Sequence, residues 1–116
     1  MWPMKRKNLG RLILKLSVVN SLLKKETKHT FNELGIKLRR KGMIEEAISN
    51  YLKAIEIDPK DEVLYHNLAG AYYKQGDPEK AIAQLKLALK LKPDFKEAQD
   101  LIVGIESLTS SLRNER

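Results

Sequence analysis

The stretches FNELGIKLRRKGMIEEAISNYLKAIEIDP (residues 31–59) and YHNLAGAYYKQGDPEKAIAQLKLALKLKP (residues 65–93) decide the fold, because they match position for position at an offset of 34 residues. The matching pairs are Phe31/Tyr65, Leu34/Leu68, Gly35/Ala69, Leu38/Tyr72, Gly42/Gly76, Ala47/Ala81, Ile48/Ile82, Tyr51/Leu85, Ala54/Ala88 and Pro59/Pro93. A helical period inside a repeating unit of this length predicts stacked helical hairpins.

Each copy contains the signals of a helix, a tight turn and a second helix. In each first helix, three large apolar residues recur at steps of three and four and form a buried stripe. Gly42 and Gly76 stand where a left-handed residue closes that helix, and Asp77-Pro78 supplies an N-cap followed by proline at the first helical position. Pro59 and Pro93 end the second helices, and Asp61 and Asp94 are expected to cap the helices that follow. The second helices also have a buried stripe, which consists of Ala47, Tyr51 and Ala54 in the first copy and Ala81, Leu85 and Ala88 in the second.

This pattern resembles the tetratricopeptide repeat, a 34-residue helix-turn-helix unit. Ala69 in place of the usual glycine, and Leu38 and Leu85 in place of aromatic residues, are mild departures. The resemblance implies an all-α, right-handed solenoid of antiparallel helix pairs, with repeats at 28–61 and 62–95. Together with flanking segments we predict about six helices, near residues 8–25, 28–41, 44–57, 62–75, 78–91 and 95–112.

The same resemblance implies a concave groove lined by the first helix of each repeat, which binds a peptide or a partner helix without catalysis. The expected partner is a protein or peptide, and an acidic one suits the cations of the groove. Carried onto this sequence, the groove residues are Asn32, Glu33, Ile36, Arg39, Arg40, His66, Asn67, Gly70, Tyr73 and Lys74, with His29 and Val63 beside them. Ordinary solvated surface, with cations matching the helix C-termini, is the alternative interpretation of the basic members.

Chaperone-binding relatives in this family hold a terminal carboxylate with Lys and Asn in the first repeat, Asn in the second, and Lys and Arg on the next helix. Asn67 fits that pattern. The other four places are occupied by Asn32, Ile36, Glu97 and Leu101. We therefore predict that this chain lacks the carboxylate clamp.

The segment before the repeats contains all of the net charge. The chain has 22 basic and 15 acidic residues, and residues 1–25 hold seven Lys or Arg with no Asp or Glu. We predict a basic flexible tail at 1–7 and an amphipathic helix at 8–27 that caps the first repeat. On a helical wheel, the apolar residues of this helix form two stripes. The continuous one, about 120° wide, is here called the main stripe, and the weaker one, which is mixed with Arg11 and Lys15, is called the second stripe. The main stripe is Leu9, Leu12, Ile13, Leu16, Val19 and Leu23, and the second stripe is Leu14, Val18 and Leu22.

Three alternatives to a purely structural cap stay open for residues 1–25. They are self-association into a homo-oligomer, contact with an anionic membrane or nucleic acid, and a removable targeting signal. At the other end we predict a capping helix and tail over 96–116. The stripe of that helix is Ala98, Leu101, Ile105, Leu108 and Leu112, and its heptad-like spacing also suits a dimer seam.

Composition argues against catalysis and cofactors. The chain has no cysteine and two histidines, His29 and His66, which are too few ligands for a metal site without a third. It also lacks a Gly-rich phosphate loop and a His-Glu-x-x-His helix. We therefore expect no enzyme activity, no metal and no cofactor, and a cytoplasmic location with peripheral membrane attachment as the alternative.

Overall fold

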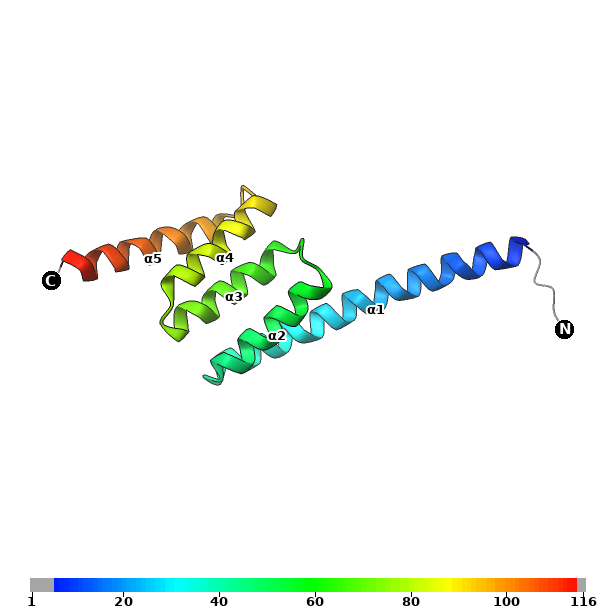
Figure 1. Cartoon of the computed structure of the whole chain (residues 1–116), viewed down its shortest axis with the longest axis horizontal. Helices are drawn as coiled ribbons and strands as arrows, with labels where there is room; N and C mark the ends of the chain where they lie inside the picture. The colour runs from blue at the N-terminus through cyan, green and yellow to red at the C-terminus, as the bar shows by residue number, and fades with distance from the viewer. Residues whose placement is uncertain (1–5, 115–116) are drawn as a thin grey trace.

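The computed structural model describes residues 6–114, and over this range the chain is entirely helical apart from its turns. The helices are α1 Arg6–Arg40, α2 Ile44–Ile57, α3 Glu62–Gln75, α4 Pro78–Leu91 and α5 Lys96–Asn114. They pack in chain order as antiparallel hairpins (Figure 1). The all-α prediction is confirmed, and the bounds of the three middle helices agree with the sequence pattern, but the described residues contain five helices where we predicted six.

Both repeat hairpins turn at a glycine. Gly42 has φ 82° and Gly76 has φ 92°, values that a residue with a side chain adopts only with strain. Met43 N donates to Leu38 O at 2.9 Å, and Gly42 N donates to Arg39 O at 3.0 Å. This pair of hydrogen bonds satisfies the last carbonyls of the first helix, and Gly76 makes the same kind of turn after α3.

The expected helix caps are present at two of three places. Asp61 accepts a hydrogen bond from Val63 N, and Asp77 accepts one from Lys80 N, with Pro78 at the first position of α4. The prediction for Asp94 is wrong, because α5 begins at Lys96 and Phe95 therefore precedes it. Phe95 is buried, and its carbonyl accepts a hydrogen bond from Gln99 N at 3.2 Å in the first turn of this helix.

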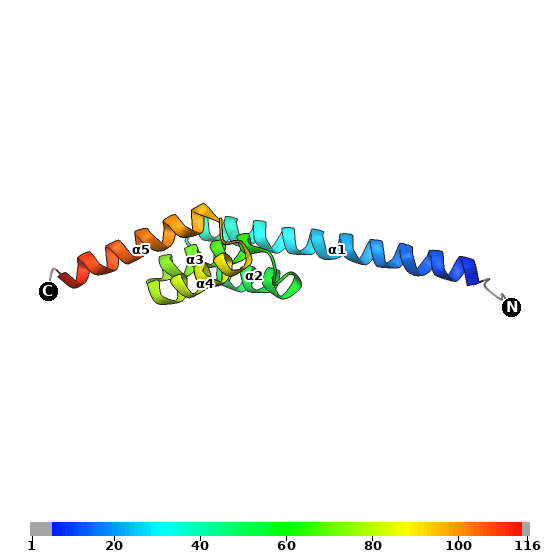
Figure 2. The same cartoon turned by 90° about the horizontal axis from the view of Figure 1, so that it is seen from above.

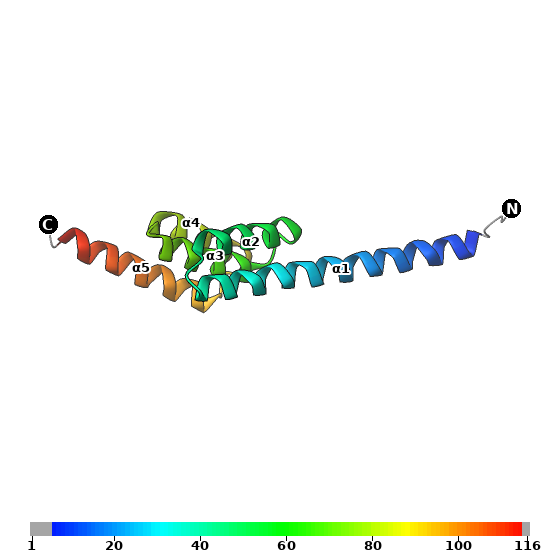
Figure 3. The same ribbon diagram turned by 90° about the horizontal axis from the view of Figure 1, so that it is seen from below.

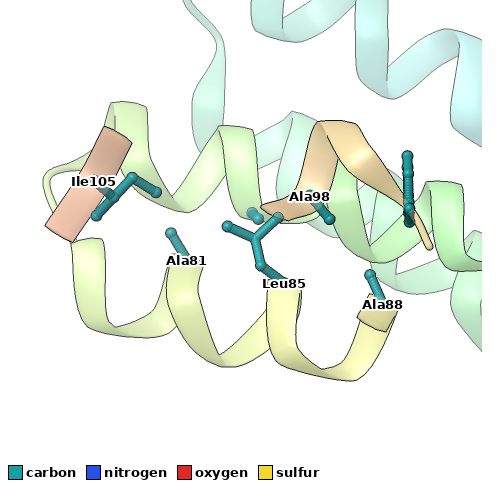
Figure 4. Close-up of a cluster of buried hydrophobic side chains, with 7 residues drawn as sticks. Ala81, Leu85, Ala88, Ala98 and Ile105 are labelled. Carbon is teal, nitrogen blue, oxygen red and sulfur yellow. The ribbon is translucent and has the colours of Figure 1, made fainter. Parts of the chain in front are cut away.

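The core is a series of small and large side chains between the two layers of helices. Its fully buried members on the second helices are Ala47, Tyr51 and Ala54 in α2 and Ala81, Leu85 and Ala88 in α4. In Figure 4 the α4 residues lie next to Ala98 and Ile105 of α5. The alanines allow close helix packing, and the larger residues fill the remaining space.

The N-terminal segment is a continuation of the first repeat helix and not a separate cap. The predicted break near Thr27 does not occur, and residues 24–28 contain no glycine or proline that would end the helix. Within this continuous helix the hydroxyls of Thr27 and Thr30 donate to Leu23 O at 2.7 Å and Glu26 O at 2.9 Å. A threonine used in this way does not cap a new helix. Of the predicted basic tail, Arg6 and Lys7 begin α1, and residues 1–5 lie outside the described residues.

As a result, nothing in the described part of the chain covers the outer face of the first repeat. Figures 2 and 3 show α1 projecting far beyond the other helices, and the molecule measures 80 × 30 × 16 Å. Leu34 is 43% exposed, whereas Leu68, at the same repeat position, is 1% exposed. The nine large apolar residues between Leu9 and Leu23 are 40–67% exposed, so the predicted capping role of residues 8–27 is wrong.

Of the described helices, α1 included, none is long and apolar enough to cross a membrane. The other flank fits its prediction better, since Ala98 and Ile105 of α5 are buried against the second repeat. Leu108 and Leu112 extend past that contact and are more than half exposed.

Candidate functional site

The first helices of the repeats lie on one face of the molecule. Figures 2 and 3 show α1 and α5 on this face and α2 and α4 on the opposite one. Between α1 and α3, Asn67 Nδ2 donates to Asn32 Oδ1 at 2.8 Å. The structure thus brings together two of the predicted groove residues from different repeats. The side chain of Asn67 also interacts with His66, while Asn32 Nδ2 can donate to another partner.

Arg39 lies across the same surface, from α1 towards α3. Its Nη1 would be 2.5 Å from a Cβ at position 70, so the guanidinium occupies the space that a side chain at Gly70 would take. Arg40 and Lys74 are exposed at the C-terminal ends of their helices, and Tyr73 is 38% exposed. This end of the face therefore presents three cations and an aromatic ring.

The remaining predicted residues differ in their accessibility. Ile36 is half-buried against the core between α1 and α2, while Glu33 and Val63 are exposed. Ile36 therefore offers an apolar edge, and Glu33 is an acid within an otherwise neutral or basic surface.

His66 is half-buried and lies against Phe95, just before the start of α5. Its ring centroid lies 5.3 Å from that of Phe95. Burial lowers the pKa of His66 below its ordinary value of 6.5, and the charge of Arg39 acts in the same direction, whereas Asn67 and Glu97 oppose the shift. The imidazole is therefore neutral near pH 7, so it contributes to the surface through packing and hydrogen bonding and not through a positive charge.

A pocket of about 400 Å³ opens where α1 leaves the repeats and α3 begins. Its lining residues are Lys25, Glu26, Lys28, His29, Asn32, Asp61 and Leu64. Lys28 Nζ forms ion pairs with Asp58 at 3.0 Å and Asp61 at 3.1 Å. The hydrogen bond with Asp58 raises the pKa of Lys28, and the same bond lowers the pKa of Asp58.

The predicted site residues did not include Lys25, Lys28, Asp61 or Leu64 of this lining. The sequence did contain a signal for this pocket. Lys28 opens the first repeat and Asp61 immediately precedes the first helix of the second, and the beginnings of neighbouring repeats lie side by side. Phe95, which packs against His66, was also missed as a neighbour of the groove.

The possible metal ligands of the described residues do not form a site. Within residues 6–114, no group of three or more His, Cys, Asp or Glu side chains is arranged to hold a metal ion. His29 lines the pocket at the start of α3, whereas His66 packs against Phe95 near α5. The face is built from amides, cations and apolar edges, which suit the binding of a polypeptide.

Comparison with known proteins agrees with this architecture. The family model described as TPR repeat matches residues 35–76, and the model described as tetratricopeptide repeat matches residues 63–95. The chain belongs to the tetratricopeptide repeat proteins, as the sequence pattern predicted.

Two curated relatives match across the repeats. Tetratricopeptide repeat protein 36 of Caenorhabditis elegans is 40% identical over 70 residues, covering 54% of this chain and 39% of that protein. The Hsp70-Hsp90 organising protein of Plasmodium falciparum is 35% identical over 74 residues, covering 64% of this chain and 29% of that protein. The chain therefore spans well under half the length of either relative.

Among solved structures, the first TPR of Spaghetti (RPAP3) bound to the HSP90 peptide SRMEEVD superposes with a TM-score of 0.70 at 26% identity. The match covers 76% of this chain and 70% of that chain. The packing of the helices is thus that of a known protein-interaction domain.

Proposed function

We propose that this chain is a non-catalytic adaptor or assembly factor that binds a peptide or a helix on the face formed by α1, α3 and α5. The observation that carries the proposal is the Asn32–Asn67 pair beside Arg39, which places backbone-binding amides and a cation on one surface spanning two repeats. Asparagine side chains can hold a peptide backbone through their paired donor and acceptor.

The charge of this surface favours an acidic ligand. Arg39, Arg40 and Lys74 outnumber Glu33, and a guanidinium pairs well with a carboxylate. The peptide bound to the RPAP3 domain, SRMEEVD, carries three acidic side chains, which is consistent with a ligand of this class.

The mode of binding that we propose does not use a terminal-carboxylate clamp. Of the five clamp positions, Asn67 alone fits, Glu97 is an acid, and Leu101 packs against the core between α4 and α5. Side-chain carboxylates of the ligand, and not its C-terminus, would then pair with the cations of α1 and α3.

Fluorescence anisotropy with labelled SRMEEVD, as the free acid and as the C-terminal amide, tests this proposal. We expect Asn67→Ala and Arg40→Glu each to weaken binding severalfold, while amidation changes affinity little. Lys86→Glu makes the same charge change as Arg40→Glu on an exposed position of α4 and serves as the matched control. Equal losses in both charge variants, or the absence of binding to the wild-type chain, would contradict the proposal.

A second candidate function is favoured by the exposure of the main stripe. Leu16, Val19 and Leu23 are 51–60% exposed on a helix segment that carries cations and no acid from residue 6 to residue 25. Such a helix suits attachment to an anionic lipid surface or self-association. In either case the repeats would project away from the contact made by this helix. Sedimentation at two protein concentrations, with and without anionic vesicles, tests it, and a monomer that ignores the vesicles would rule it out.

A further inference from the structure

The second stripe has no covering partner in the described part of the chain. Leu14, Val18 and Leu22 are 67%, 58% and 57% exposed on the projecting half of α1. Apolar side chains grouped in this way on a protruding helix mark an interaction site more often than scattered single ones do.

The second stripe continues the direction of the groove. Because α1 is one unbroken helix from Arg6 to Arg40, residues 18 positions apart, about five turns of ~3.6 residues, point to the same side. The pairs with this spacing are Leu14 and Asn32, Val18 and Ile36, and Leu22 and Arg40. Each second-stripe residue therefore shares its direction with a predicted groove residue.

The same 18-residue spacing shows that the main stripe does not point in the direction of the groove. Leu16 lies 18 positions before Leu34, and Ile13 lies 18 positions before Phe31. In the second repeat, the counterpart of Leu34 is Leu68, which is buried with Ala47 and Tyr51 of the preceding hairpin. The counterpart of Phe31 is Tyr65, which packs against the core of its own hairpin. The two stripes thus belong to different surfaces, and it is the second stripe that joins the groove through the pocket lined by Lys25 and His29.

Cations surround the second stripe. Arg11 and Lys25 lie seven residues, about two turns, before and after Val18, and Lys15 lies seven residues before Leu22. No acidic residue occurs in α1 before Glu26. The surface is therefore apolar at its centre, with Arg11 and Lys25 in line with Val18 beyond its two ends and Lys15 along one edge.

We propose that the ligand-binding surface of the groove extends along α1 over the second stripe and accepts an acidic amphipathic helix. This inference rests on the proposed function, because it gives the groove ligand a class and a length. The ligand would place apolar residues one turn apart over Leu14, Val18 and Leu22 and acidic residues against Arg11, Lys15 and Lys25. From Leu14 to Ile36 the surface is about 33 Å long at ~1.5 Å per residue, which corresponds to a ligand helix of about 22 residues.

Other occupants fit these features less well. A second copy would bring an acid-free basic segment against this one, and like charges oppose such pairing. Nucleic acid would neutralise the cations but leave the three apolar side chains in water. A flat bilayer that contacts the main stripe would leave the second stripe, on nearly the opposite side of the helix, exposed.

The test compares two triple variants that match in residue type and exposure. L14Q/V18Q/L22Q removes the second stripe, and L16Q/V19Q/L23Q removes the corresponding part of the main stripe; glutamine keeps a high helix propensity in both. The probe is a synthetic 22-residue helix with leucine at steps of three and four and glutamate at the other positions. The short acidic peptide SRMEEVD serves as a groove-length probe.

We expect the wild-type chain to bind the 22-residue acidic helix, and L14Q/V18Q/L22Q to bind it at least tenfold more weakly, while L16Q/V19Q/L23Q binds it as the wild type does. Binding of SRMEEVD should be unchanged in both triple variants. A lysine-for-glutamate version of the long helix should not bind.

Several results would overturn the inference: no binding of the acidic helix to the wild-type chain, equal losses in the two triple variants, or equal binding of the basic helix. A loss confined to L16Q/V19Q/L23Q on anionic vesicles would instead assign α1 to a lipid surface. If Asn67→Ala weakens binding of SRMEEVD while L14Q/V18Q/L22Q leaves the long helix unaffected, the inference fails and the proposed function stands. If L14Q/V18Q/L22Q weakens the long helix while Asn67→Ala affects neither probe, the proposed function fails.

Discussion

Replacement of Gly35 by alanine tests the packing between the two helices of the first repeat. A Cβ at this position would lie 2.6 Å from Tyr51 Cε1 and 2.8 Å from Tyr51 Cδ1, well inside ordinary van der Waals contact. Tyr51 is fully buried among residues that include Ala47 and Leu68, so its ring has little room to move. Overpacking of this kind costs about 1–3 kcal/mol. Removing glycine from a helix returns about 0.5–1 kcal/mol.

We therefore expect Gly35→Ala to lower the free energy of unfolding by about 0–2.5 kcal/mol, centred near 1 kcal/mol, and each kcal/mol lowers Tm by roughly 4–8 °C in a small domain. Gly104→Ala is the matched control, because a Cβ there meets nothing within 4 Å, and it should stabilise the chain by about 0.5–1 kcal/mol. Urea unfolding followed by circular dichroism measures both values. A Gly35→Ala variant as stable as Gly104→Ala would refute the close packing of α1 on Tyr51.

Three further predictions follow from charges and exposure. Lys28→Met should reduce stability near pH 7, and the difference from wild type should shrink as pH falls below 3.8, because the lowered pKa of Asp58 contributes stability that is lost on protonation. Unfolding at pH 7 and at pH 2.5 measures this difference, and a difference that does not change with pH would contradict the prediction. The half-buried neutral His66, whose pKa is lowered, should make the chain lose stability as pH drops below 6.5. His66→Gln should remove that slope in unfolding curves from pH 7 to pH 5, and an unchanged slope would assign it to other groups. Amides of residues 8–22 should exchange with deuterium far faster than those of residues 31–38, since an unsupported helix of this length is marginally stable, and equal protection would mean that the segment is covered in solution.

The repeat core was predictable because its determinants are local. Glycine at two turns, Asp77-Pro78 and the alternation of alanine with larger residues each specify a feature within one 34-residue unit. The helices Ile44–Ile57, Glu62–Gln75 and Pro78–Leu91 accordingly have the expected bounds.

The N-terminal segment was not predictable in the same way. Its wheel shows apolar stripes, which we interpreted as buried surfaces of a folded-back cap. Folding back requires a turn, however, and the sequence from Lys24 to Lys28 contains no glycine or proline. The helix therefore continues through Thr27 and Thr30, and the apolar side chains between Leu9 and Leu23 stay exposed.

The predicted groove residues remain predictions about binding, but the structure shows which of them meet. The family resemblance placed Asn32 and Asn67 in the same groove, and they form a hydrogen bond. It did not reveal that Arg39 covers Gly70 or that Phe95 packs on His66, because those contacts depend on side-chain direction between repeats.

The most direct test of the binding face is a ¹⁵N–¹H NMR titration of the labelled chain with SRMEEVD and with the 22-residue acidic helix. We predict that both ligands shift the amides of Asn32, Asn67 and Lys74, and that the long helix also shifts those around Val18. The amides around Lys86 on α4 should stay in place. Shifts concentrated on α2 and α4, with residues 29–40 and α3 unaffected, would contradict the account.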